Sequence, residues 1–150
     1  MARAAGEECR DIHFDVCYCS PLKRAKETAQ LVLAGRDIPI IYDDRLMEMS
    51  FGCCEGMANV KQDEENPMYL LFADPVHYRP VEGAESFQDL FARTGSFLQE
   101  VVEPDLQAGK DVLIVGHGAM NSSILCQVKH VSLEHFWDAG IPNCKLMKLI

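Results

Sequence analysis

The sequence predicts an α/β fold of three layers, in which a mostly parallel sheet lies between two layers of helices. Two observations carry this prediction. Short apolar stretches at 14–19, 38–42 and 111–115 have the length and composition of buried strands. Between them, apolar residues recur at helical spacing over 22–33 and 87–102. Strands that alternate with helices in this way are typical of a parallel sheet.

The first strand and the first strong helix meet at Ser20-Pro21. The stretch FDVCYC predicts the strand, Ser20 is a favourable N-cap, and Pro21 suits the first helical position. We expect the helix to end at Gly35, since glycine adopts the left-handed conformation that closes helices. The stretch IPIIY predicts the second strand, and Pro39 places its first residue or a sheet edge there.

The middle of the chain is less regular. Two glycine turns predict a loop over 43–56. Prolines break the following segment, 57–82, which we expect to hold one or two short helices. We interpret 57–82 as a helical insertion within a single domain that spans 1–150, because a chain of 150 residues is the size of one domain.

The last part of the chain predicts two helices and two strands. From Ser86 a continuous apolar stripe predicts a long helix, which Pro104 and Gly109 close. The stretch DVLIV predicts a strand buried on both faces, and a Gly-His-Gly turn joins it to a helix that begins with AMNSSILCQV. The stretch CKLMKLI, 144–150, predicts a final strand.

Composition excludes several classes of protein. The formal net charge of −9 repels nucleic acid and anionic membranes, so neither is an expected partner. No apolar run approaches the length of a membrane span, and the first residues carry no signal-peptide pattern. Seven cysteines show no paired spacing, which favours free thiols in the cytoplasm over a metal site or a disulfide framework. We expect neither a metal nor another cofactor.

Two strand-to-helix joints predict an anion-binding pocket. The carboxyl ends of parallel strands meet at one edge of a sheet, so Ser20 and His117 are expected to lie there together. Helix N-termini at this edge favour anions, and Arg24 lies on the first turns of its helix. Taken alone, His117 could equally be a turn histidine with a satisfied hydrogen bond, and Arg24 a solvated helix residue.

Spacing argues against other phosphate chemistries. A cysteine phosphatase needs five residues between its cysteine and its arginine, and neither Cys17 nor Cys19 stands at that distance from Arg24. A nucleophile elbow would need serine in place of His117, and the P-loop pattern is absent.

Four segments, in order, resemble the motifs of the histidine phosphatase superfamily. CSPLKRAKETAQLV is similar to S-x-L-x-R-A-x-x-T-A, and RLMEMSFGCCEG is similar to L-x-E-x-x-x-G-x-x-E-G. EGAESFQDLFAR resembles G-E-S-x-x-D-x-x-x-R, with Ala84 where the second glycine is usual, and VLIVGHGAM resembles V-x-H-G. The motifs cover nearly the whole chain, and the nearest branch is the phosphoglycerate-mutase-like phosphatases, whose fold the resemblance implies.

The resemblance also implies roles for particular residues. Arg24 would hold the phosphoryl group by bidentate contact, and His117 would donate to a phosphoryl oxygen and support the transition state. Glu48 would protonate the leaving oxygen. Ser20 and the N–H of Ala119 would join the phosphate pocket. Without the resemblance, Glu48 could be a loop carboxylate paired with a neighbouring arginine. Two further motif carboxylates, Glu55 and Glu85, are expected either to be structural or to support the residues that contact the phosphoryl group.

One departure from the family matters more than the matches. The family begins with a strand that ends in R-H-G, and this histidine is the nucleophile. The sequence contains no R-H-G, and of its five histidines only His117 lies in a matching motif. His13 precedes the first visible strand and is expected at the wrong edge of the sheet. The stretch ARAAGEECRDIHFD resembles the helix that follows the missing strand, so we expect an N-terminally shortened domain.

The sequence therefore predicts a phosphomonoesterase that acts on a small phosphorylated metabolite through a phosphohistidine, with the nucleophile absent from this chain. The alternatives are a phosphoryl-binding module without a nucleophile and an inactive fragment. A sheet that lacks an interior strand leaves open edges, and such edges recruit other strands, so self-association is expected.

Overall fold

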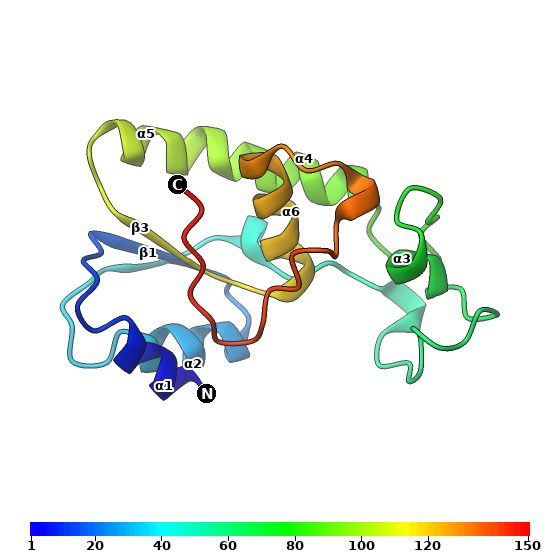
Figure 1. Ribbon diagram of the computed structural model, residues 1–150, viewed down its shortest axis with the longest axis horizontal. Coiled ribbons are helices and arrows are strands. Elements are labelled where there is room, and N and C mark those ends of the chain that lie inside the picture. Colours follow the sequence, from blue (N-terminus) through cyan, green and yellow to red (C-terminus); the bar gives the residue numbers. More distant parts are fainter.

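A computed structural model describes residues 1–150 and contains a three-stranded parallel sheet (Figure 1). The strands are β1 (Val16–Cys19), β2 (Ile40–Tyr42) and β3 (Val112–Val115), in the order β2-β1-β3. The first three of the four predicted strands are therefore confirmed, each shorter by one or two residues at its start. Strand β1 is central and completely buried, whereas β2 and β3 form the two edges.

Helices cover both faces of the sheet, as the three-layer prediction requires (Figure 1). Helices α1 (Ala2–Glu8) and α2 (Lys23–Val32) pack on one face around a cluster that includes Cys17 and Leu113. The other face carries α4 (Phe87–Phe97) and α6 (Gly118–Lys129), and its cluster includes Tyr18, Phe97 and Ile124. Alternate residues of β1 point to the two layers, which is why the whole strand is apolar.

The start of α2 differs from the prediction. Ser20 is not its N-cap and Pro21 is not its first residue, because the helix begins at Lys23 and Leu22 occupies the N-cap without a side-chain hydrogen bond. The Ser20 hydroxyl accepts the Leu22 N–H at 3.3 Å and also reaches across the sheet edge. The helix ends at Val32, and the chain turns at Gly35, whose φ of +77° suits glycine.

The long helix that begins after Ser86 runs further than predicted. Ser86 is its N-cap and accepts the Asp89 N–H at 3.0 Å. Pro104 does not end the helix, because α4 continues through a π-helical stretch (Leu98–Val102) into α5 (Glu103–Gln107). Proline lacks an N–H and would clash with the carbonyl one turn earlier, and the wider π turn next to it accommodates both effects. The chain then turns at Gly109, where φ is +78°.

The segment 57–82 forms mostly turns and one short helix, α3 (Tyr69–Ala73). Three 3₁₀ helices complete the chain, at Asp44–Leu46, Gly52–Cys54 and Leu133–His135. A third apolar cluster joins α3 to α4 and to the residues after α6, with aromatic rings edge-on around Phe136. Gly52 is required nearby, since a Cβ at this position would lie 2.2 Å from the Glu82 carbonyl oxygen.

The predicted final strand is wrong, because 144–150 has no regular secondary structure. Cys144 packs against the α1 and α2 layer, whereas Leu149 packs against the opposite layer, so the segment crosses the sheet instead of pairing with a strand. Strand β3 is also less buried than predicted: Leu113 and Val115 are buried, but Val112 and Ile114 are only half-buried. None of the helices is long and apolar enough to cross a membrane.

Candidate phosphoryl-binding site

The carboxyl ends of β1 and β3 bring two predicted site residues together. The parallel register pairs Cys19 with Val115, the last residues of β1 and β3. Ser20 follows Cys19 directly, and His117 follows Val115 after one glycine. The His117 Nε2 and the Ser20 Oγ are 2.8 Å apart, although 97 positions separate them in the sequence. Both residues are buried, with exposures of 7% and 0%, so this contact is a fixed part of the sheet edge.

Arg24 completes this group from the first turn of α2. Its Nε donates to the His117 Nδ1 at 3.2 Å, which makes Nδ1 an acceptor. In a neutral ring the proton then lies on Nε2, which donates to the Ser20 Oγ. The network therefore fixes the tautomer as well as the orientation of His117.

The guanidinium of Arg24 keeps its two Nη groups free of protein acceptors. Nε is its only side-chain nitrogen with a protein acceptor, and the residue is exposed. The two Nη groups are free to bind both oxygens of an anion in the bidentate manner that suits phosphate. Arg24 is therefore an exposed residue of which one donor is held by the buried His117.

His117 is held in its neutral form. Burial lowers the pKa of His117, the Glu48 carboxylate opposes this shift, and the positive charges of Arg24 and Arg93 lower the pKa further. A neutral ring can accept from Arg24 and donate to Ser20 simultaneously, whereas a protonated ring would lose the first contact. At neutral pH the ring therefore accepts from Arg24 and donates to Ser20.

Glu48 lies at the N-terminus of α6, facing the same site. Its Oε1 accepts the N–H of Met49 at 2.8 Å and of Met120 at 3.1 Å. Its Oε2 accepts the N–H of Ala119 at 3.3 Å. The N–H of Ala119, predicted to bind phosphate, is thus directed at Glu48, and phosphate can reach this donor only if Glu48 moves. Arg45 is not a partner of Glu48.

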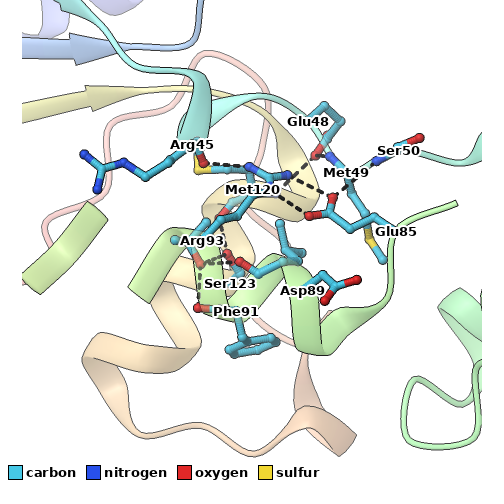
Figure 2. A network of polar contacts seen from close by, with 12 residues as sticks. Arg45, Glu48, Met49, Ser50, Glu85, Asp89, Phe91, Arg93, Met120 and Ser123 are labelled. Carbon is cyan, nitrogen blue, oxygen red and sulfur yellow. Dashed lines mark hydrogen bonds and ion pairs between the residues drawn. The ribbon is translucent and has the colours of Figure 1, made fainter. Parts of the chain in front are cut away.

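The loop that carries Glu48 contacts the α4 region through Arg93 and Glu85 among other residues, and Figure 2 shows this network. Arg93, on α4, binds the Glu85 carboxylate and the Arg45 carbonyl oxygen. For Glu85 the sequence predicts a structural or supporting role, whereas Arg93 was missed. The available signal was the segment EGAESFQDLFAR, whose final residue is this arginine.

Gly116 and Gly118 suit the close packing around His117. A Cβ on Gly116 would lie 1.8 Å from the Met120 Cε, so the turn between β3 and α6 leaves space for the Met120 side chain. A Cβ on Gly118 would lie 3.9 Å from the Glu48 Oε2, which is an ordinary van der Waals contact. The packing of Met120 at the start of α6 therefore favours glycine at position 116.

The other candidate nucleophiles lie away from this group or are protonated. Burial raises the pKa of the Cys19 thiol to about 11 and that of Cys17 to about 12, so neither forms a thiolate at neutral pH. His13 lies before β1, at the opposite edge of the sheet, where its Nε2 is 2.9 Å from Asp15. His77 and His135 each contact an aspartate three positions away, and His130 ends α6.

At that opposite edge, His13, Asp15 and Asp111 place one potential metal-ligand atom each within 4.8 Å of one another. All three are exposed, and Asp15 already accepts the Asp111 N–H at 2.8 Å. The contacts among them join the starts of β1 and β3.

Comparisons with known proteins identify a family. A family model described as the histidine phosphatase superfamily (branch 1) matches residues 1–150. A 2,3-bisphosphoglycerate-dependent phosphoglycerate mutase of Cytophaga hutchinsonii is 34% identical over 136 residues, which cover 89% of this chain and 64% of the mutase. Phosphoserine phosphatase 1 of Hydrogenobacter thermophilus is 29% identical over 144 residues, which cover 95% of this chain and 67% of the phosphatase.

Solved structures give the same family relationship. Bacillus stearothermophilus YhfR matches with a TM-score of 0.80 and 32% identity, over 91% of this chain and 67% of the YhfR chain. The alpha-ribazole phosphatase from Shigella flexneri matches with a TM-score of 0.73 and 29% identity, again over 91% of this chain and 67% of the other. The chain thus spans about two thirds of the length of the proteins that it resembles.

Proposed function

Because the chain belongs to the histidine phosphatase superfamily (branch 1), we propose that it carries the phosphoryl-binding site of a phosphomonoesterase acting on a small phosphorylated metabolite. The observation that carries this proposal is the arrangement of Arg24. Its Nε is fixed on a buried, neutral histidine, and its two Nη groups have no protein acceptor. This arrangement prepares the guanidinium for a bidentate anion without occupying it.

In this proposal the phosphoryl group binds between Arg24, His117 and Ser20. Arg24 takes two phosphoryl oxygens, and the dianion draws a proton onto His117, which then donates to a third oxygen. The Ser20 hydroxyl keeps the ring oriented through its contact with Nε2. The substrate is a small phosphate ester, as the names of the related mutases and phosphatases suggest.

Glu48 is proposed as the acid that gives a proton to the leaving oxygen. Phosphate would compete with its carboxylate for the N–H of Ala119, which joins the pocket once Glu48 turns toward the leaving group. The acid therefore begins in a defined position beside the site, at the N-terminus of α6, and its release is coupled to substrate binding.

The full reaction also needs a nucleophile. A histidine nitrogen would form a bond to phosphorus as the ester P–O bond breaks, and water would then release phosphate and restore the histidine. The sequence contains no Arg-His-Gly stretch, and the four other histidines have partners or positions outside the site. We therefore propose that the nucleophile is absent from this chain, which then binds phosphoryl groups without turning them over.

The net charge and the cysteines bear on the expected partners and on the cellular compartment. The net charge of −9 disfavours nucleic acid as a partner. All seven cysteines are free thiols, and a reducing compartment such as the cytoplasm suits them. No step of the proposed chemistry uses a metal or another cofactor.

Titration with inorganic phosphate tests the proposal. We expect phosphate to shift the NMR signals of the Arg24 side chain and the His117 ring, and Arg24→Gln to weaken binding by at least about tenfold, as loss of a charged bidentate contact would. Arg10→Gln is the matched control, since Arg10 forms only a surface ion pair with Glu7. Phosphate binding that is unchanged in Arg24→Gln would refute the site.

Hydrolysis of p-nitrophenyl phosphate tests the second half of the proposal. We expect the 150-residue chain to show little or no turnover. Robust turnover that His117→Ala abolishes, in protein freed of contaminating phosphatase, would mean that the chain does supply a nucleophile.

A further inference from the structure

We propose that Arg93 and Glu85 are positioning residues that hold Glu48 against the N-terminus of α6. This inference rests on the proposed function only for the role that it gives Glu48. The role of the pair is mechanical, because it fixes both ends of the segment 45–50, at whose centre the acid lies. We call the pair and its contacts with this segment the clamp.

The first end of the segment is fixed at Arg45. The Arg93 Nη1 donates to the Arg45 carbonyl oxygen at 2.6 Å, three residues before Glu48 (Figure 2). The side chain of Arg45 points elsewhere and pairs with Asp43 and Glu100. Arg93 therefore contacts the backbone of the segment directly, and its contact survives any change in the side chain at position 45.

The second end is fixed at Ser50 through Glu85. The Glu85 N–H donates to the Ser50 carbonyl oxygen at 2.9 Å, and the Ser50 N–H approaches the Glu85 Oε2 at 3.4 Å. The Ser50 hydroxyl donates to the Gly83 carbonyl oxygen at 3.1 Å. Ser50 thus pairs with the chain just before α4, two residues after Glu48.

The two ends are joined by one ion pair. Arg93 binds Glu85 through Nε at 2.6 Å and through Nη2 at 3.0 Å, which is the bidentate geometry. The exposed fractions of the two side chains are only 22% and 15%, so solvent screens this pair less than an exposed one. A single guanidinium therefore connects both ends of the segment to α4.

Only arginine can make all of these contacts at once. Its three nitrogens are used separately: Nη1 for the Arg45 carbonyl, and Nε with Nη2 for Glu85. Lysine keeps the charge but concentrates its donors on one atom, so it cannot hold a carboxylate bidentately and a carbonyl on the other side. Replacing Arg93 with lysine therefore removes the shape of the guanidinium while it keeps the positive charge.

Buried side chains leave the carboxylate of Glu48 little freedom once the ends are fixed. Leu46 and Met49 are 0% and 1% exposed and anchor the segment in two different apolar clusters. Between them Glu48 can place its oxygens on the N–H groups of Ala119 and Met120. The positive charge of Arg93 also lowers the pKa of His117, which places the clamp within electrostatic reach of the phosphoryl site.

Amide hydrogen exchange can read out the position of Glu48 directly. The first N–H groups of a helix have no acceptor within the helix, and Glu48 is the only protein acceptor for those of Ala119 and Met120. The next N–H, that of Asn121, donates to the His117 carbonyl oxygen at 2.7 Å and serves as an internal reference. A displacement of Glu48 therefore leaves the amides of Ala119 and Met120 without an acceptor and spares that of Asn121.

The experiment compares Arg93→Lys and Glu85→Gln with the wild-type chain. We expect the amides of Ala119 and Met120 to exchange at least about tenfold faster in both variants, with Asn121 and the β1 amides unchanged within about twofold. Arg10→Lys and Glu7→Gln are the matched controls, since they alter an arginine–glutamate pair on the surface. These controls should leave exchange at all of these amides unchanged.

Two results would overturn the proposal. Unchanged exchange at Ala119 and Met120 in Glu85→Gln and Arg93→Lys would show that Glu48 keeps its position without the clamp. Acceleration that is uniform over all amides, or failure of both variants to fold, would show that the pair serves general stability. Neither result depends on phosphate, so failure of the proposed function would appear separately, as absent phosphate shifts at Arg24 and His117 in the wild-type chain.

Discussion

At the scale of single residues, the burial of His117 links its protonation to the stability of the fold. Its folded-state pKa is lowered, mainly by burial, so the unfolded chain binds the proton more tightly than the folded chain. The stability that results is fully present above the unfolded pKa of about 6.5 and is lost as the pH falls below it. We therefore expect the melting temperature to decrease between pH 7 and pH 5, with a smaller decrease in His117→Gln.

The same residue gives a linked expectation for binding. An anion beside the ring favours the protonated form, so phosphate should raise the pKa of His117. NMR titration of the ring with and without phosphate measures this shift, and the exposed His77 provides the comparison ring. A ring whose pKa does not respond to phosphate would place the anion away from His117.

The sequence alone predicts that some residues of the site are neighbours, but it does not predict this for others. Ser20 and His117 were predictable neighbours because parallel strands end at the same edge, and Arg24 follows from the helix that starts there. The partner of Ala119 was not predictable, since the contact with Glu48 depends on the path of an irregular loop. Arg93 was missed for a similar reason: its role depends on where α4 meets that loop.

At the scale of elements, local patterns predicted the helices better than their caps or the pairing of strands. Apolar residues at helical spacing correctly predicted the helix that follows Ser86, and the structure adds that Ser86 is its N-cap. Ser20 was wrong as an N-cap, because α2 begins two residues later than predicted, at Lys23. The strand predicted at 144–150 failed because a strand needs a hydrogen-bonded neighbour, which local pattern does not guarantee.

The cap at Ser86 can be measured. Ser86→Ala removes the acceptor of the Asp89 N–H, and we expect the free energy of unfolding to fall by about 1 kcal/mol. Ser132→Ala is the matched control, because Ser132 precedes a 3₁₀ helix without forming a side-chain cap, and its effect should be close to zero. Urea denaturation of both variants compares the two serines, and equal losses would show that the Ser86 hydroxyl does not cap α4.

At the scale of the whole molecule, the open edge of β3 is the feature with the widest consequence. Strand β3 pairs with β1 on one side only, and no strand lies on its other side. Two of its four side chains are half-buried, and the crossing segment 144–150 exposes the apolar side chains of Leu146, Met147 and Ile150. A parallel sheet is normally covered on both faces and pairs its interior strands on both sides.

This edge predicts self-association, because unpaired strands recruit other strands. The net charge of −9 opposes contact between copies, so association should increase as salt screens that charge. We expect size-exclusion chromatography to show oligomers or aggregates of the isolated chain, more at high than at low ionic strength. Joining an upstream segment that carries an Arg-His-Gly strand should cover β3, restore a monomer and raise the melting temperature. If the short chain is a monomer at all salt concentrations and melts as high as the extended one, the edge is tolerated, and the three-stranded sheet is then sufficient to present Arg24 and His117 by itself.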